Sequence, residues 1–257
     1  MGASSSAIAI CAPLLIDLSR RRNSITTPTS FVKDLGSLKL ENTFNPYSER
    51  CAVHDRENAP RLRSETLGAM LEAAGGYDID SIWIGRDLGY RGGRRTGLAL
   101  TDDVHSDAHG ARWGISVERP TKGRVVAERT AFIVWGILAR VKAPIFLWNV
   151  FPLHPHEPDN PFTNRSHNPL ERKAGEEFLA QLISLLRPSR LIAIGNDAEL
   201  TAKHLSGQAK VIKVRHPSYG GQTRFLSQIA DLYDLCEPRQ GDEASHQLSL
   251  FQEHAES

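Results

Sequence analysis

Ser81-Ile82-Trp83-Ile84, which stops at Gly85, is the stretch of sequence that decides the fold. Three more short and largely apolar runs follow it along the chain, at residues 145–148, 191–194 and 211–214. Strands of continuous apolar residues that alternate with helices are typical of a parallel sheet covered on both faces. We therefore predict an α/β protein, a three-layer α/β/α sandwich around a four-stranded parallel sheet.

Helical segments precede, separate and follow these strands, with apolar residues at helical spacing. The predicted helices cover residues 60–74, 127–141, 170–186, 197–205 and 222–235. We expect one domain over residues 41–236 and a disordered acidic tail over residues 237–257. For residues 1–40 we predict a loosely structured arm, with a strap across the domain as the alternative.

The composition is that of an ordinary globular protein. Of the 257 residues, 40% are hydrophobic and 24% are charged, which excludes collagen-like, coiled-coil and wholly disordered chains. The formal net charge of +1 argues against a histone-like polycation. The charge is unevenly spread, however. Residues 237–257 carry −4, so the rest of the chain carries +5 and is modestly basic, and any nucleic-acid binding would need a local basic patch.

Cysteine usage and hydropathy bear on the compartment. Cys11, Cys51 and Cys236 are far apart and form no CxxC pair, which is typical of a reducing compartment. No apolar run reaches the roughly 18 residues that span a membrane. The arginines at 20–22 follow the apolar stretch near the N-terminus, whereas a signal peptide has its basic residues first. We predict a cytoplasmic monomer.

Polar segments stand where three of the predicted strands end. In a sheet of this kind, ligands bind beyond the carboxyl ends of the strands. The first segment, residues 85–97, holds four arginines that suit phosphate contacts and Asp87, a carboxylate that suits activation of water. A surface turn with solvated arginines is its alternative. The second segment holds Asn149, and the third holds His216.

Asn149 and His216 carry the chemistry of the other two segments. The Asn149 amide presents a donor and an acceptor together, which suits the edge of a base. His216 comes directly after a strand and is followed by Pro217, Ser218 and Tyr219. The alternatives are an asparagine that bonds neighbouring loop backbone and a structural histidine.

Together the three segments resemble motifs of the uracil-DNA glycosylase superfamily, over residues 81–235. Gly85-Arg86-Asp87 stands where that superfamily has a Gly-x-Asp-Pro or Gly-x-Asn-Pro loop, and His216-Pro217-Ser218 stands where it has a His-Pro-Ser loop. Asn149 matches the asparagine that closes the second strand, and Thr96-Gly97 matches a Thr-Gly of the single-strand-selective branch. The resemblance implies a DNA repair glycosylase that hydrolyses the N-glycosidic bond of flipped-out deoxyuridine and leaves an abasic site.

The resemblance also implies a role for each matched residue. Asp87 would position or activate water, Asn149 would read the uracil edge, and His216 would donate a hydrogen bond to uracil O2. Ser218 would contact phosphate, and Tyr219 would lie near the minor groove. No metal and no cofactor is implied. The predicted catalytic residues are Asp87 and His216; the substrate-binding residues are Gly85, Arg86, Leu88, Gly89, Leu100 and Asn149; the DNA-binding residues are Arg91, Arg94, Arg95, Ser218 and Tyr219.

Departures from the superfamily pattern bear on the substrate. Leu88 replaces the usual proline, and Leu100 occupies the place of a stacking aromatic residue. Gly89 stands where one branch has a tyrosine that excludes the thymine methyl group, so rejection of C5-modified uracil is weakened. Two alternatives remain open: a non-catalytic binder of damaged or abasic DNA on the same fold, and a small α/β hydrolase or nucleotide-binding protein.

Two further features lie outside these motifs. His154, His156 and His167 belong to a proline-rich loop whose spacing matches no standard metal site, so we predict exposed histidines near DNA. In the acidic tail, Gln247-Leu248-Ser249-Leu250-Phe251 resembles the pentapeptide by which bacterial repair and replication proteins bind the sliding clamp. Apolar anchors on a disordered tail can dock in a groove, so the resemblance implies the bacterial sliding clamp as a partner.

Overall fold

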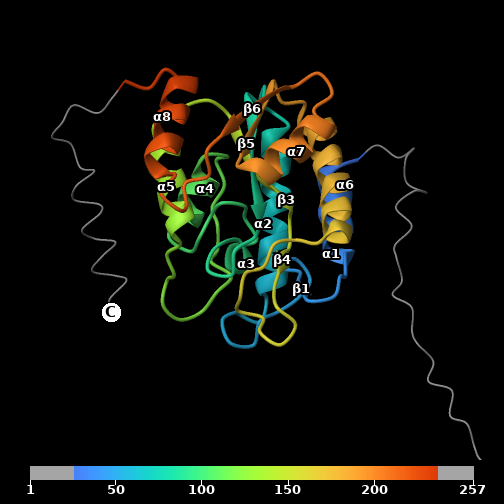
Figure 1. Ribbon diagram of the computed structural model, residues 1–257. Helices are drawn as coiled ribbons and strands as arrows, with labels where there is room; N and C mark the ends of the chain where they lie inside the picture. Colours follow the sequence, from blue (N-terminus) through green and yellow to red (C-terminus); the bar gives the residue numbers. More distant parts are fainter. Residues whose placement is uncertain (1–25, 237–257) are drawn as a thin grey trace, which may run out of the picture.

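The computed structural model describes residues 26–236 (Figure 1). Their centre is a four-stranded sheet in the order β3-β2-β5-β6, in which all neighbouring strands are parallel. The strands are β2 (Ser81–Asp87), β3 (Ile145–Phe151), β5 (Arg190–Ile194) and β6 (Lys210–Val214). The predicted four-stranded parallel sheet is confirmed.

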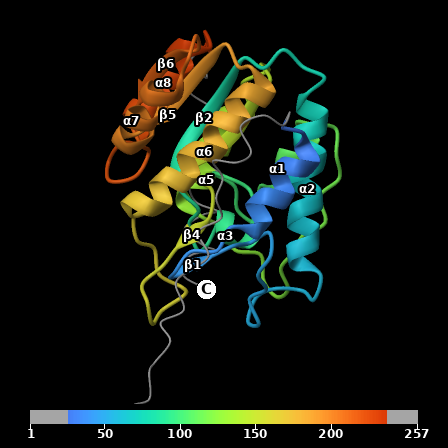
Figure 2. The same cartoon turned by 90° about the vertical axis from the view of Figure 1, so that its right-hand side faces the viewer.

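Helices cover both faces of this sheet, which gives the predicted three layers (Figure 1, Figure 2). One face carries α1 (Pro28–Ser37), α2 (Ala59–Ala74), α6 (Pro169–Leu186) and α7 (Asn196–Leu205), and the other carries α5 (Arg129–Leu138) and α8 (Gln222–Leu232). Two short helices, α3 (Gly93–Thr96) and α4 (Ser106–Ala111), lie between β2 and α5. A separate antiparallel pair joins β1 (Thr43–Phe44) to β4 (His154–Pro155). Within residues 26–236, no helix has the length and apolar character needed to cross a membrane.

Side chains of the strands point alternately to the two faces of the sheet, so the hydrophobic core consists of two clusters, one on each face. Ile82 and Ile84 of β2 belong to the cluster beneath α1, α2, α6 and α7, whereas Trp83 belongs to the cluster beneath α5 and α8. All three side chains are fully buried. Because successive side chains of a strand point to opposite faces and both faces are covered, the buried central residues of β2 are apolar on both faces. That is why continuous apolar runs predicted the sheet.

Helix α1 corrects the prediction for the N-terminal region. The helix begins after Thr27, whose side chain accepts a hydrogen bond from a backbone amide of the first turn, and Pro28 takes the first helical position. Phe31 and Leu35 are fully buried, and the Phe31 ring lies 5.5 Å from that of Trp148 in β3. This part of the chain belongs to the core, so the prediction of a loosely structured arm is wrong for it.

Strands β2 and β3 extend beyond the apolar runs that predicted them. Gly85 pairs with Asn149, and Asp87 pairs with Phe151, inside the parallel ladder. Polar residues that we expected in loops therefore stand within the sheet itself. Backbone hydrogen bonds of the ladder fix their positions more rigidly than a loop would.

Candidate active site

Gly85 and Asn149 face each other at the carboxyl end of the sheet, on the adjacent strands β2 and β3. A Cβ atom added to Gly85 would lie 2.4 Å from Asn149 Oδ1 and 3.0 Å from Leu100 Cδ2. The amide and the leucine side chain thus occupy the space that a side chain at position 85 would take. The structure brings these three predicted substrate-binding residues together. It also explains why position 85 is a glycine, because no side chain fits there.

The Asn149 side chain is buried without a hydrogen bond. It is 1% exposed, and neither Nδ2 nor Oδ1 has a partner among the described residues. A buried polar group without a partner costs about 1–3 kcal/mol, so each such group calls for an explanation. The alternative from the sequence, an asparagine that bonds neighbouring loop backbone, is therefore wrong, because no backbone group among the described residues bonds the amide. The amide can bind a ligand edge that carries one donor and one acceptor.

Asp87 occupies the last position of β2 and is held by two side chains. His167 Nδ1 is hydrogen-bonded to one carboxylate oxygen, and Arg86 Nε donates to the other at 2.7 Å. Only 7% of the Asp87 side chain is exposed. The two donors fix the orientation of the carboxylate, while each oxygen keeps a lone pair that a water molecule can use. Asp87 is therefore placed to accept a proton from water or to face a developing positive charge.

Sequence reasoning missed His167. It stands 80 residues from Asp87 along the chain, so no local pattern connects the two. Its side chain is 2% exposed, and His154 is fully buried, with Nδ1 at 2.8 Å from the Leu88 carbonyl oxygen. Burial lowers the pKa of His154 to about 4. The prediction of exposed histidines is wrong for both residues, because their loop returns to the carboxyl end of the sheet.

His216 follows β6 and lies beside Gly195 at the end of β5. The Ser218 amide donates to His216 Nδ1 at 3.2 Å, and Ser218 Oγ lies 2.7 Å from the same atom. Because Nδ1 accepts, the neutral ring carries its proton on Nε2. Burial, together with the positive charges of Arg86 and Arg215, lowers the pKa of His216 to about 4. At neutral pH the residue is an uncharged N–H donor.

The two residues that follow this histidine motif differ in their placement. Ser218 directs its amide and its hydroxyl at His216, so it orients the ring, and its predicted contact with phosphate stays a prediction. Tyr219 is 97% exposed with a φ of +52°, a conformation that non-glycine residues rarely adopt. Its side chain projects from the protein, as the predicted place near DNA requires.

The four arginines of residues 85–97 fall into two pairs. Arg86 and Arg91 are exposed, as contact with DNA requires. Arg94 and Arg95 are each 3% exposed. Arg94 stacks on the aromatic ring of β1 at 4.1 Å, and Arg95 Nη2 lies 2.6 Å from Asp103. For Arg94 and Arg95 the prediction of DNA contact is wrong, and so is the alternative of solvated arginines, because α3 turns both side chains inward onto protein partners.

The remaining predicted substrate-binding residues differ in their surroundings. Leu88 is 3% exposed and packs against Gly93, where an added Cβ would lie 2.4 Å from Leu88 Cδ2. Leu88 therefore packs against α3, and its predicted contact with substrate stays a prediction. Gly89 has open space around it, with no atom within 4 Å of an added Cβ. Leu100 has a φ of +54°, and Trp135 Nε1 donates to its carbonyl oxygen at 3.1 Å, which holds Leu100 beside Gly85.

Comparisons with known proteins identify the family and a similar fold. The family model for the Uracil DNA glycosylase superfamily matches residues 91–233, more than half of the chain. Among solved structures, the crystal structure of wild-type SMUG2 from Pedobacter heparinus has a similar fold, with a TM-score of 0.56 and 12% sequence identity over 81% of this chain and 97% of that one. No curated protein matches the sequence. The chain belongs to the uracil-DNA glycosylase superfamily and has a glycosylase-type function.

Proposed function

We propose that the protein hydrolyses the N-glycosidic bond of deoxyuridine that has been flipped out of DNA, and leaves an abasic site. The observation that carries this proposal is the buried Asn149 amide without a partner. Uracil presents N3–H and O4 side by side, so Oδ1 can accept from N3–H while Nδ2 donates to O4. The base would supply the two hydrogen bonds that the free protein lacks, and their formation would offset the cost of unstacking the nucleotide.

Cleavage of the bond places opposite charges on its two halves. As the bond between C1′ and N1 breaks, its electron pair goes to the base, and the sugar becomes a cation resembling an oxocarbenium ion. His216 Nε2–H would donate to O2 and stabilise the uracil anion. Asp87 would face the cation and accept a proton from the water whose oxygen bonds to C1′. A neutral donor and a fixed carboxylate supply both functions without a metal ligand set.

Surface residues near Asp87 and His216 would hold the DNA. Arg86 and Arg91 are exposed next to the end of β2 and suit phosphate oxygens. Tyr219 projects from the loop that carries His216, where an aromatic ring can replace the flipped base in the stack. Open space at Gly89 supports tolerance of a substituent at C5 of the base.

The test is release of uracil from a labelled oligonucleotide in EDTA, followed by cleavage of abasic sites with alkali. We expect release by the wild type and strong loss in Asp87→Asn and His216→Gln. Binding without release would favour the alternative, a non-catalytic binder of damaged or abasic DNA. Release that is unaffected by either substitution would show that the site is misassigned.

We also propose a cytoplasmic monomer that binds the bacterial sliding clamp. The clamp motif, Gln247 to Phe251, lies outside the described residues, so this part of the proposal rests on the sequence alone. Deletion of residues 247–251 should abolish clamp binding, measured by surface plasmon resonance, and leave uracil release intact. Unchanged clamp binding would end this idea.

A further inference from the structure

Leu100 lies at the candidate active site in a backbone conformation that leucine rarely adopts. Its φ of +54° is in the left-handed region, where the Cβ atom crowds the following carbonyl group. In this conformation Leu100 Cδ2 lies 3.0 Å from the position that a Cβ atom of Gly85 would take, next to the buried Asn149 amide. Backbone strain of this kind persists only where surrounding contacts hold the residue.

Hydrogen bonds fix the backbone on both sides of Leu100. The Thr101 hydroxyl donates to the Ala99 carbonyl oxygen at 2.9 Å, and the Thr96 hydroxyl donates to the Thr101 carbonyl oxygen at 3.0 Å. The Leu100 carbonyl oxygen itself accepts from Trp135 Nε1 at 3.1 Å. The indole N–H thus fixes the direction of the carbonyl group of the strained residue.

Two histidine rings hold the Trp135 ring, which is 5% exposed. His105 stacks on it, with the ring centroids 6.0 Å apart and the planes 13° apart, and the centroid of the His109 ring lies 5.2 Å from that of Trp135. His105 Nδ1 in turn lies 2.6 Å from Asp102 Oδ1. The position of the indole therefore depends on a ring that a buried carboxylate holds.

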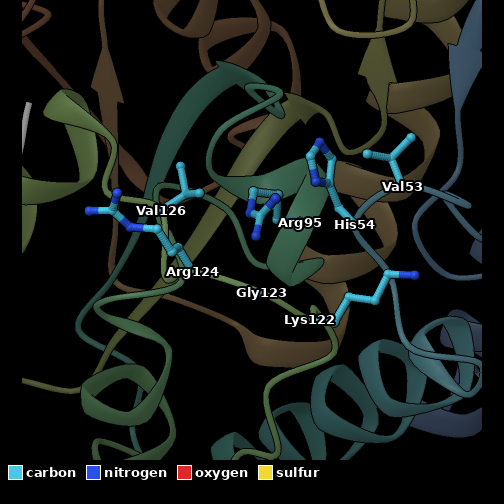
Figure 3. Close-up of a pocket in the computed structure, with 7 residues that line it drawn as sticks. All are labelled: Val53, His54, Arg95, Lys122, Gly123, Arg124 and Val126. Carbon is cyan, nitrogen blue, oxygen red and sulfur yellow. The ribbon is translucent and has the colours of Figure 1, made fainter. Parts of the chain in front are cut away.

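Two carboxylates that follow the strained leucine tie its segment to the start of α5. Asp102 Oδ2 accepts from the Glu128 amide at 2.6 Å, at the N-cap of α5. Asp103 Oδ2 accepts from the Val126 amide at 3.2 Å and from Arg95 Nη2 at 2.6 Å. The side chains of Val126 and Arg95 line one hollow (Figure 3). Because α5 also carries the indole, the hydrogen-bond donor and the strained residue are fixed relative to each other.

We propose that Trp135 is a positioning residue for base binding. Its indole N–H holds Leu100 in the left-handed conformation and so keeps the leucine side chain against the flipped-out base. The Asn149 amide binds one edge of the base, and the Leu100 methyl groups cover a neighbouring face. The cost of the left-handed conformation and the stabilisation by one hydrogen bond are of the same order, so loss of the N–H lets the peptide group rotate. The proposal rests on the proposed function, because it takes a base as the ligand of Asn149.

Trp135→Phe tests the proposal, because it removes the indole N–H and keeps an aromatic ring in the core. Binding is measured by fluorescence anisotropy on two oligonucleotides that are not cleaved. One carries 2′-fluorodeoxyuridine, whose fluorine destabilises the sugar cation, and the other carries a tetrahydrofuran abasic analogue, which has no base. We expect Trp135→Phe to raise the Kd for the first oligonucleotide about tenfold and to leave the Kd for the second unchanged. An unchanged Kd for both would overturn the proposal.

Trp83→Phe is the matched control. Trp83 is fully buried in the same core cluster as Trp135, and its Nε1 donates to the Tyr233 hydroxyl at 3.0 Å. The hydroxyl of Tyr233 also contacts Ser81, at the start of β2 and therefore at the opposite end of the sheet from the site. We expect Trp83→Phe to lower Tm as much as Trp135→Phe does and to change neither Kd. Equal rises of Kd in the two variants would overturn the proposal, because loss of core packing would then explain both.

Leu100→Gly separates positioning from packing. Glycine adopts the left-handed conformation without strain and has no side chain to place, so Trp135 has nothing left to position. We expect Leu100→Gly to raise the Kd for the fluorinated oligonucleotide about tenfold, and Trp135→Phe added to it to raise the Kd less than about twofold further. Effects that multiply to about a hundredfold would overturn the proposal, because the two residues would then act independently.

Failure of the proposed reaction gives a different result. If the wild type releases no uracil from the ordinary substrate, but Trp135→Phe still weakens binding of the fluorinated oligonucleotide alone, the reaction fails and the positioning role stands. If the wild type releases uracil and Trp135→Phe binds both oligonucleotides as the wild type does, the reaction stands and the positioning role fails.

Discussion

Replacement of Asn149 by leucine should stabilise the protein and abolish its activity. The change removes two buried polar atoms that have no partners, at about 1–3 kcal/mol each. Strain from the added bulk beside Gly85 offsets part of this gain, at about 1–3 kcal/mol. We expect a net increase of about 1–2 kcal/mol in the free energy of unfolding. For a chain of this size, that raises Tm by about 2–4 °C per kcal/mol.

Activity should move in the opposite direction. Two lost hydrogen bonds to the base, at about 1.5 kcal/mol each, correspond to a decrease of about 100-fold or more in kcat/KM. Urea unfolding and the alkali-cleavage assay measure the two effects on the same samples. A gain of stability with loss of function is expected where a group is kept unsatisfied for a ligand.

Asn45 provides the matched control, because it is also 1% exposed but has hydrogen bonds. Its Nδ2 donates to the carbonyl oxygens of Leu35 and Leu38 at 2.8 and 3.0 Å, and its Oδ1 accepts from the Tyr47 amide at 3.0 Å. Asn45→Leu must therefore destabilise the protein by several kcal/mol, about 1–3 for each group left without a partner. If Asn149→Leu destabilises to the same extent, the Asn149 amide is satisfied in the free protein, and the reasoning from its burial is refuted.

Three further predictions concern the same site. Gly85→Ala should lower kcat/KM about 100-fold in steady-state kinetics, because the added methyl group displaces Asn149 Oδ1. Gly89→Ala adds a methyl group to open space and should leave kcat/KM unchanged. Equal values of kcat/KM for the two variants would contradict this geometry. His167→Ala should slow single-turnover release of uracil about tenfold. His167→Asn, whose amide nitrogen can take the place of Nδ1, should recover part of the rate. Equal release rates for the two variants would show that the hydrogen bond to Asp87 is irrelevant. The folded pKa of His216, about 4, lies below the unfolded value of about 6.5, so the unfolded chain binds more protons between these values and stability falls as pH drops through that window. Urea unfolding between pH 7 and pH 4.5 should show a shallower fall for His216→Gln, by at most about 1.4 kcal/mol per pH unit, and parallel curves would exclude this contribution.

The sheet and half of the site follow from local sequence. Strands buried on both faces must be apolar throughout, so Ile82-Trp83-Ile84 is readable without any partner. Parallel strands then bring their carboxyl ends to one edge, which is how Gly85, Asn149 and His216 could be predicted to share a site. No pairing register was needed, because each residue lies near the carboxyl end of its strand.

The other half depends on partners that are distant in sequence. The glycines next to Arg95 in the sequence suggest a solvated side chain. In the structure the Arg95 side chain is buried, and its ion pair with Asp103 offsets the free-energy cost of burying the charge. His167 reaches Asp87 because a long loop returns to the sheet, and its spacing in the chain carries no sign of this. Phe31 and Leu35 are two apolar residues in a short helix, too few to distinguish a core helix from a loose segment by periodicity.

Arg86 connects the two charged functions of the proposed reaction. Its Nε donates to Asp87, and its positive charge contributes to the lowered pKa of His216. The same guanidinium thus anchors the anion that would face the sugar and adds to the effect of burial, which favours the uncharged histidine. A uracil anion would form beside a neutral donor in a potential that is already positive, so its stabilisation would require little reorganisation. Loss of this side chain would leave the carboxylate held by His167 alone and let His216 gain a proton more readily, and both changes would act on the chemical step. In the proposed reaction Arg86 therefore works through Asp87 and His216 as well as through any phosphate that it contacts.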